Sequence, residues 1–338
     1  MINLITLLAS IFVFGLLITA HELGHFLLAK LNGVKVLEFS IGMGPRLFKI
    51  RGDETVYSLR LLPIGGYVKM LGEDEESDDP RAFRNQNPWK RFSILVAGAL
   101  MNFILAIILF TIIFYNVGVT TLIIENVVKD FPAYQAGIRP GDKIIAVNDK
   151  PVSTWNEFIV FMSNNGSNPL KLTIKKDNII TDKIVKPKLE EKENRYIIGI
   201  SPHVEKGNIL ISLTNSIKET TSSIKQMLIY IGKLITRKVS TEQLGGPVAI
   251  IKMSGEAAKI GIWSLLYFAG FLSINLGVIN LIPFPALDGG WVVITLFEGI
   301  TGKKIDENKI GFINLVGFTL LMLLALIVTY RDIMRIFS

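Results

Sequence analysis

The sequence predicts a polytopic α-helical membrane protein with four transmembrane helices, a cytoplasmic β-hairpin region and an extracytoplasmic α/β domain. Three observations predict this fold class. Half of the 338 residues are apolar and only 19% are charged, against roughly 25% charged residues in an ordinary soluble domain. The mean hydropathy is +0.45. The apolar residues also gather in a few long runs instead of being spread evenly.

Four of these runs are long enough to cross a bilayer, which takes about 20 residues of helix. They cover residues 2–31, 92–117, 263–283 and 311–330, and the last three contain no charged residue. The first run lacks the basic n-region of a cleaved signal peptide, because no Lys or Arg precedes Lys30. We therefore expect it to be retained as a membrane span.

Basic residues in short loops predict the orientation of the spans. Residues 35–91 contain ten Lys or Arg, whereas none precedes the first run. We expect these residues in the cytoplasm, and both termini and residues 118–262 outside, although Arg331 and Arg335 argue mildly against an outer C-terminus. The net charge of +7 then reflects membrane anchoring. Since the basic residues are interspersed with acids, we expect a lipid bilayer and no nucleic acid as partner.

The segments between the spans differ in pattern. Residues 34–70 alternate partly between apolar and polar positions and are broken by glycines, which predicts short hairpins. Residues 209–235 repeat apolar side chains at helical spacing, which predicts an amphipathic helix on the membrane surface or the outer domain. We expect four parts: residues 1–117 with two spans and the hairpins, 118–203 as the α/β domain, 204–260 as an outer helical segment, and 261–338 with two spans.

The first span contains the sequence H-E-x-x-H, formed by His21, Glu22 and His25. Positions i and i+4 share one face of a helix, so both imidazoles can reach one metal ion, with Glu22 beside them to take a proton from water. Ionisable groups in the hydrocarbon core are costly and usually functional. This cost argues against two histidines that are neighbours by chance.

A catalytic zinc site usually has three protein ligands, and the third can be sought by elimination. Cysteine is absent and His203 lies in the outer segment. If the first span starts at the outer surface, His21 lies about 30 Å deeper, near the cytoplasmic edge. Asp288, the only acid between Glu256 and Glu298, follows the third span at that same edge. Spacing alone favours a loop or N-cap Asp, but topology and elimination favour a metal ligand.

Pro283 and Pro285 prevent a continuous helix just before Asp288. Broken backbone at membrane depth is tolerated only where it lines an enclosed or watery cavity. Asn280 precedes this break, and its amide is either a donor to a developing oxyanion or an ordinary helix-packing group, as Asn102 and Asn275 would be.

Two motifs make the chain resemble the site-2 protease family of intramembrane zinc metalloproteases, in the bacterial RseP/RasP type (regulator of sigma-factor protease). They are H-E-L-G-H and N-x-x-P-x-P-x-L-D-G-G. The resemblance covers essentially the whole chain. It includes residues 21–25, 42–45, 62–69, 97–102 and 280–290.

The outer segment is similar to a protease-associated PDZ domain, through a signature at residues 132–148. An exposed strand edge in such a domain can accept a peptide as an added strand.

The resemblance implies a zinc ion held by His21, His25 and Asp288, with Glu22 as catalytic acid/base and Asn280 in a supporting role. It implies cleavage of transmembrane segments of pre-trimmed, single-span proteins such as anti-sigma factors, and remnant signal peptides are possible further substrates. It also implies a multi-pass protein of the bacterial inner or plasma membrane, with the active site near the cytoplasmic face. The PDZ-like module would limit access by large ectodomains, and the hairpin region would pair with the unwinding substrate.

Three alternatives stay open. A catalytically inactive peptide-binding scaffold of the same fold need not keep both Glu22 and Asp288. A zinc transporter would carry several intramembrane acids along a path, whereas these are confined to one layer. A sporulation-type relative would lack the PDZ-like insert.

Overall fold

The computed structural model describes residues 3–73, 75, 77–190, 195–237 and 245–337. The chain divides into two compact units. A helical unit comprises Met1–Leu109 and Met227–Ser338, and a second unit comprises Phe110–Gln226. The chain thus leaves the helical unit once and returns to it once.

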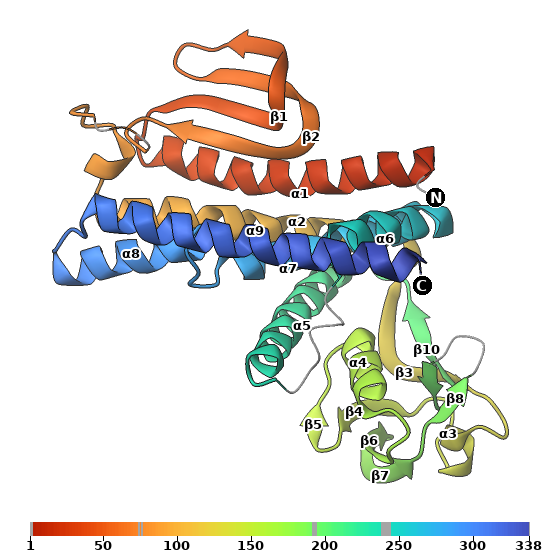
Figure 1. Ribbon diagram of the computed structural model, residues 1–338. Coiled ribbons are helices and arrows are strands. Elements are labelled where there is room, and N and C mark those ends of the chain that lie inside the picture. The colour runs from red at the N-terminus through yellow and green to blue at the C-terminus, as the bar shows by residue number, and fades with distance from the viewer. Residues whose placement is uncertain (1–2, 74, 76, 191–194, 238–244, 338) are drawn as a thin grey trace. The chain divides into compact units, whose positions relative to one another are not determined.

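Four helices in the described part of the chain are long and apolar enough to cross a membrane, as the sequence predicts. They are α1 (Leu4–Leu31), α2 (Pro88–Val117), α7 (Ile262–Asn280) and α9 (Glu307–Phe337). Helix α1 begins after Asn3, whose side chain accepts a hydrogen bond from the Thr6 amide at 2.9 Å. In Figure 1, the axes of α1 and α9 are nearly parallel, but the two helices run in opposite chain directions, because the N-terminus and the C-terminus both lie at their right-hand ends.

The prediction of several short hairpins is wrong, because this region forms one long hairpin that doubles back on itself. Strands β1 (Val36–Arg51) and β2 (Val56–Met70) pair antiparallel. Ser40 pairs with both Tyr67 and Ser58, so each strand contributes two segments to one folded sheet (Figure 1).

The glycines that suggested turns stand where these strands bend. Gly42 and Gly65 have φ of 85° and 95°, a region that glycine reaches at little cost. Bulges at such positions bend a strand without ending it. The glycines therefore do indicate where the chain bends, but the chain continues through each bend as a β-strand.

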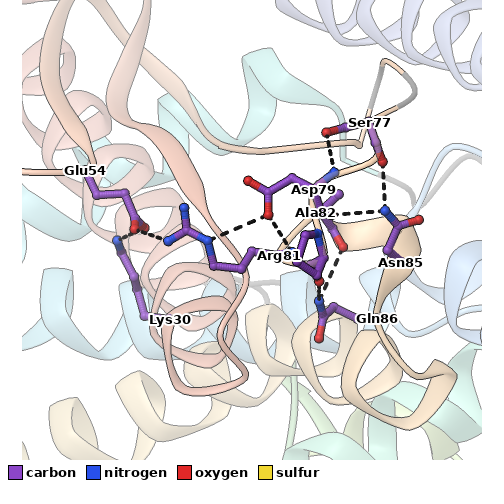
Figure 2. A network of polar contacts seen from close by, with 9 residues as sticks. Lys30, Glu54, Ser77, Asp79, Arg81, Ala82, Asn85 and Gln86 are labelled. Atoms are coloured by element: carbon purple, nitrogen blue, oxygen red, sulfur yellow. Dashed lines mark hydrogen bonds and ion pairs between the residues drawn. The ribbon is translucent and has the colours of Figure 1, made fainter.

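A polar network ties the end of α1 to the hairpin and to the segment that follows it (Figure 2). Lys30 Nζ and Arg81 Nη1 donate to the two carboxylate oxygens of Glu54 at 2.7 and 2.8 Å. Arg81 Nε also lies 3.8 Å from Asp79 Oδ1. The hydrogen bond from Lys30 lowers the pKa of Glu54. Because these side chains are about a third to a half exposed, the ion pairs add little stability.

The second unit contains the expected α/β domain. Its sheet has the strand order β10 (Ile200–Glu205), β3 (Val119–Val127), β4 (Lys143–Val147), β6 (Leu170–Lys176) and β7 (Ile179–Val185), with β5 (Lys150–Pro151) paired to β4. Alternate residues of β6, Leu170, Leu172 and Ile174, are buried in the core, as the period of a half-buried strand requires. The domain boundaries at residues 118 and 203 stay predictions. The unit also contains α3 (Pro132–Gln135), α4 (Trp155–Asn165), β8 (Lys188–Glu190) and β9 (Arg195–Ile197).

In the described residues, three further helices are α5 (Ile209–Ile235), α6 (Pro247–Ile260) and α8 (Asp288–Thr301), and a 3-10 turn, η1, covers Phe83–Asn85. Helix α5 coincides with the predicted amphipathic helix. The amino end of α6 is capped by Asp332 of α9, whose carboxylate accepts hydrogen bonds from the amides of Gly246 and Ala249 at 3.2 and 2.9 Å.

Candidate metal centre

His21 and His25 lie on one face of α1, as their spacing predicts. Both side chains are buried, and their rings meet edge to face with centroids 4.7 Å apart. The two Nε2 atoms are 3.2 Å from each other. Two imidazoles therefore point the same type of atom at one position inside an apolar helix bundle.

Asp288 reaches the same position from the other end of the sequence. It is the first residue of α8, after a loop in which Pro283 and Pro285 end α7 and Ala286 has a φ of 70°. Its Oδ2 atom lies 3.1 Å from His21 Nε2 and 3.4 Å from His25 Nε2. The broken backbone thus carries a carboxylate to the two histidines.

The glycine after Asp288 is required by the tightness of this loop. A Cβ on Gly289 would lie 2.1 Å from the carbonyl oxygen of Ile282, well inside van der Waals contact. Only a residue without a side chain lets α8 begin so close to the end of α7. In the D-G-G sequence, Asp288 therefore supplies the carboxylate, and Gly289 allows the tight loop that brings it to the histidines.

The spacing of these three atoms fits a tetrahedral zinc ion. Nitrogen and oxygen ligands at about 2.0–2.2 Å from a tetrahedral zinc stand roughly 3.3 Å from one another, and the three separations here are 3.1, 3.2 and 3.4 Å. Despite this closeness, Asp288 Oδ2 is buried and has no hydrogen-bond partner among the described residues. A cation between the three atoms would supply the missing partner.

Helix α2 leaves room beside the imidazoles. A Cβ on Gly98 would lie 2.3 Å from His25 Nε2 and 2.6 Å from His21 Cε1. The absence of a side chain at this position keeps the ligand atoms free on that side. The donor set, the unpartnered oxygen and the space at Gly98 all fit a bound metal ion.

Two groups on α2 orient the rings from behind. His25 Nδ1 lies 2.8 Å from the backbone carbonyl of Ile94. Because a carbonyl only accepts, Nδ1 carries a proton, and in the neutral imidazole Nε2 then has a free lone pair for a metal ion. The side-chain amide of Asn102 lies 3.2 Å from His21 Nδ1. Ser273 Oγ donates to the Asn102 backbone carbonyl at 2.8 Å, which holds that turn of α2 against α7.

Asn102 is the residue that sequence reasoning missed. It is fully buried, whereas its place in an apolar span predicts a helix-packing group. Its position in an uncharged apolar span was the available signal, since a buried amide needs hydrogen-bond partners. Nothing in the helical period, however, tells which residue of α2 lies at the depth of His21.

The two other predicted site residues also lie at this centre. The Nδ2 atom of Asn280, the last residue of α7, lies 3.3 Å from His21 Nε2. Glu22 follows His21 on α1 and is partly buried. Strand β2 passes directly over it, because a Cβ on Gly66 would lie 3.1 Å from Glu22 Cγ. The structure thus gathers all five predicted side chains, and their chemical roles stay predictions.

Comparison with known proteins gives one family and several relatives. The family described as Peptidase family M50 matches residues 9–324. A Clostridium acetobutylicum protein whose name proposes a zinc metalloprotease is 46% identical over 325 residues, covering 96% of each chain. The regulator of sigma-W protease RasP of Bacillus subtilis is 31% identical, covering 98% of this chain and 99% of its own.

Among solved structures, the PDZ domain of an SdrC-like protein from Listeria monocytogenes is similar over 25% of this chain and 86% of its own length, with 22% identity and a TM-score of 0.22.

Proposed function

This chain belongs to peptidase family M50, and we propose that His21, His25 and Asp288 hold the catalytic zinc of this site-2-type metalloendopeptidase. The observation that carries the proposal is the convergence of three ligand atoms within 4.8 Å of one another. They come from two helices separated by more than 250 residues of sequence, in a part of the molecule where unpaired polar atoms are costly.

The chemistry that zinc supplies when bound is polarisation of the scissile carbonyl and a lowered pKa of water. Glu22 takes the proton of the attacking water and returns it to the leaving amine. Asn280 donates a hydrogen bond to the developing oxyanion. Its amide is already beside His21 Nε2, so it needs little movement to reach a carbonyl oxygen at this centre.

The substrate must present an extended peptide bond, because a helix hides its amides in its own hydrogen bonds. The hairpin supports an added-strand interaction, since β2 passes over Glu22 at Gly66. We therefore assign as substrates the transmembrane segments of single-span proteins already trimmed outside. Anti-sigma factors are the leading candidates, because the Bacillus subtilis relative is named for sigma-W regulation; remnant signal peptides are further candidates.

The orientation proposed for the membrane follows the basic loop at residues 35–91. The active site lies near the cytoplasmic face, and the termini and the α/β domain lie outside. In this arrangement the PDZ-like α/β domain excludes substrates with large ectodomains. An inactive scaffold of the same fold is not favoured, because it would not need Glu22 beside a complete ligand set.

The test is cleavage of a single-span reporter in proteoliposomes by wild type and Glu22→Gln. We expect cleavage to fall by about 10²- to 10⁴-fold, the usual contribution of a general base, while zinc content is unchanged. Glu256→Gln is the matched control, because Glu256 is an exposed acid on α6; its cleavage rate stays at the wild-type level. Persistent cleavage by Glu22→Gln would show that the proton-transfer assignment is wrong.

A further inference from the structure

A second buried ionic contact lies in the helical unit, outside the proposed metal centre. Arg91 and Glu298 are 8% and 7% exposed, and Arg91 Nη2 forms a short ion pair with Glu298 Oε2. The other carboxylate oxygen accepts a hydrogen bond from the Ile305 amide at 3.2 Å. Buried charges of this kind are rare and need an explanation.

Arg91 belongs to the same short stretch of α2 that orients His25. It stands in the first turn of α2, three residues before Ile94, whose carbonyl accepts the proton of His25 Nδ1. Residues three apart on a helix lie on one face. One turn of α2 therefore contacts both α1, through His25, and α8, through Glu298.

Glu298 lies on the helix that carries Asp288. Ten residues separate the two carboxylates, which corresponds to about 15 Å along a continuous helix. Within α8 only Gly289, Thr295 and Glu298 are buried, and Glu298 is the one charged side chain among them. A contact at this end of a rigid helix sets the direction in which its first residue, Asp288, points.

We propose that Arg91 and Glu298 are a positioning pair that fixes Asp288 relative to His21 and His25. The inference rests on the proposed ligand set. In this proposal neither Arg91 nor Glu298 contacts substrate or metal. The pair acts through two helices: α2 fixes the orientation of the His25 imidazole, and α8 fixes the position of the Asp288 carboxylate.

The nature of the contact agrees with a positioning role. A buried ion pair adds little net stability compared with apolar packing, but its geometry is directional. Arg91 Nε has no hydrogen-bond partner among the described residues, so the guanidinium depends on Glu298 for its orientation. Metal centres lose affinity when groups behind the ligands are removed, typically by about 10- to 100-fold.

The experiment is a double-mutant cycle on the full-length protein in detergent: wild type, Arg91→Gln, Glu298→Gln and the double variant. The readouts are zinc affinity by chelator competition and the visible spectrum of the Co²⁺-substituted protein. We expect each single variant to weaken zinc binding by about 10- to 100-fold and to alter the Co²⁺ spectrum. The double variant should be no worse than either single one, because the two residues act as a unit.

Unchanged affinity and spectrum in the folded variants, or purely additive effects in the double variant, would overturn the proposal. The double variant leaves no unpaired buried charge, so it serves if a single variant fails to fold. Asp332→Asn is the matched control: Asp332 is a 4% exposed acid of the same unit, and we expect lower thermal stability with unchanged Co²⁺ spectrum. A similar spectral change in this control would also overturn the proposal.

His21→Ala in the same assay separates this inference from the proposed function. If His21→Ala keeps its zinc, the ligand assignment is wrong. If it loses zinc while the Arg91 and Glu298 variants keep full affinity, only the positioning role is wrong.

Discussion

Two carboxylates of the helical unit, Glu38 and Asp288, differ in their hydrogen-bond and ion-pair partners. Glu38 on β1 is 8% exposed and is fully partnered: Arg46 and Arg60 lie 2.7 and 3.0 Å from its oxygens, and Ser58 donates to it at 2.5 Å. Asp288 Oδ2 lies next to the Nε2 atoms of His21 and His25 and has no hydrogen-bond partner among the described residues.

The difference separates a structural carboxylate from a ligand. Burial raises the pKa of Glu38, but the hydrogen bonds from Ser58 and Arg60 outweigh burial and lower the pKa to about 2. The Glu38 site is therefore complete without any added ion. The Asp288 site collects three lone pairs and supplies no cation of its own, which is the arrangement that a metal ion completes.

The largest expected effect is on the Asp288 side of this comparison. Asp288→Asn should reduce cleavage of a single-span reporter at least about 100-fold, because an amide is a poor substitute for an anionic ligand. Thermal stability of the metal-free protein should change little, since no hydrogen bond to Oδ2 is lost. Normal cleavage by this variant would remove the distinction between the two carboxylates.

Glu38→Gln should lower the stability of the protein and leave the metal centre intact. Removing one partner of a buried ion pair costs about 3 kcal/mol of stability, here because Arg60 and Arg46 would lose their counter-charge. Chemical denaturation of the metal-free form measures this loss, and zinc content should be unchanged. If Glu38→Gln lost zinc, the hairpin network would have to be part of the metal centre.

The same network predicts a pH dependence. The pKa of Glu38 is lowered from 4.5 to about 2 on folding, so its stabilisation is complete above pH 4.5 and is lost as the pH falls towards 2. The stability difference between wild type and Glu38→Gln should therefore shrink steadily below pH 4.5 in denaturation series. A difference that does not depend on pH would mean that Glu38 does not act through its charge.

A smaller effect is expected from filling the space beside the imidazoles. In Gly98→Ala the new methyl group would lie 2.3 Å from His25 Nε2 unless the ring moves. Zinc affinity should fall about tenfold, measured by chelator competition. Gly311→Ala on α9 is the matched control, because a Cβ there meets open space, and its affinity should equal that of wild type.

The smallest effect is expected from the exposed network of Figure 2. Glu54→Gln removes two ion pairs to Lys30 and Arg81, but partly exposed pairs contribute only about 0–1 kcal/mol each. Both zinc content and cleavage should match wild type. A loss above about 2 kcal/mol in denaturation would show that the network is more than a surface contact.

The sequence predicted the four helices and the side chains that meet at the candidate centre, for definite reasons. Apolar length specifies a span, and the period of a helix puts His21 and His25 on one face. Asp288 followed from topology, since it was the only acid available at the right depth. These inferences use local geometry or simple counting, and the structure brings the three side chains together.

The groups behind the ligands could not be predicted in this way. Which turn of α2 meets His25, and that Arg91 meets Glu298 across 207 residues of sequence, depends on how the helices are packed against one another. The doubled-back hairpin was missed for a related reason. A glycine such as Gly42 is compatible with either a turn or a β-bulge. Which of the two forms depends on the pairing of Ser40 with two different strand segments.

The most direct test of the central claim is the zinc content of purified protein, measured by elemental analysis for wild type, His25→Ala and Glu38→Gln. We expect one zinc per chain in wild type and in Glu38→Gln, and less than about a tenth of that in His25→Ala, because two protein ligands are too few for a stable zinc site. Full zinc content in His25→Ala would show that His25 is not a zinc ligand.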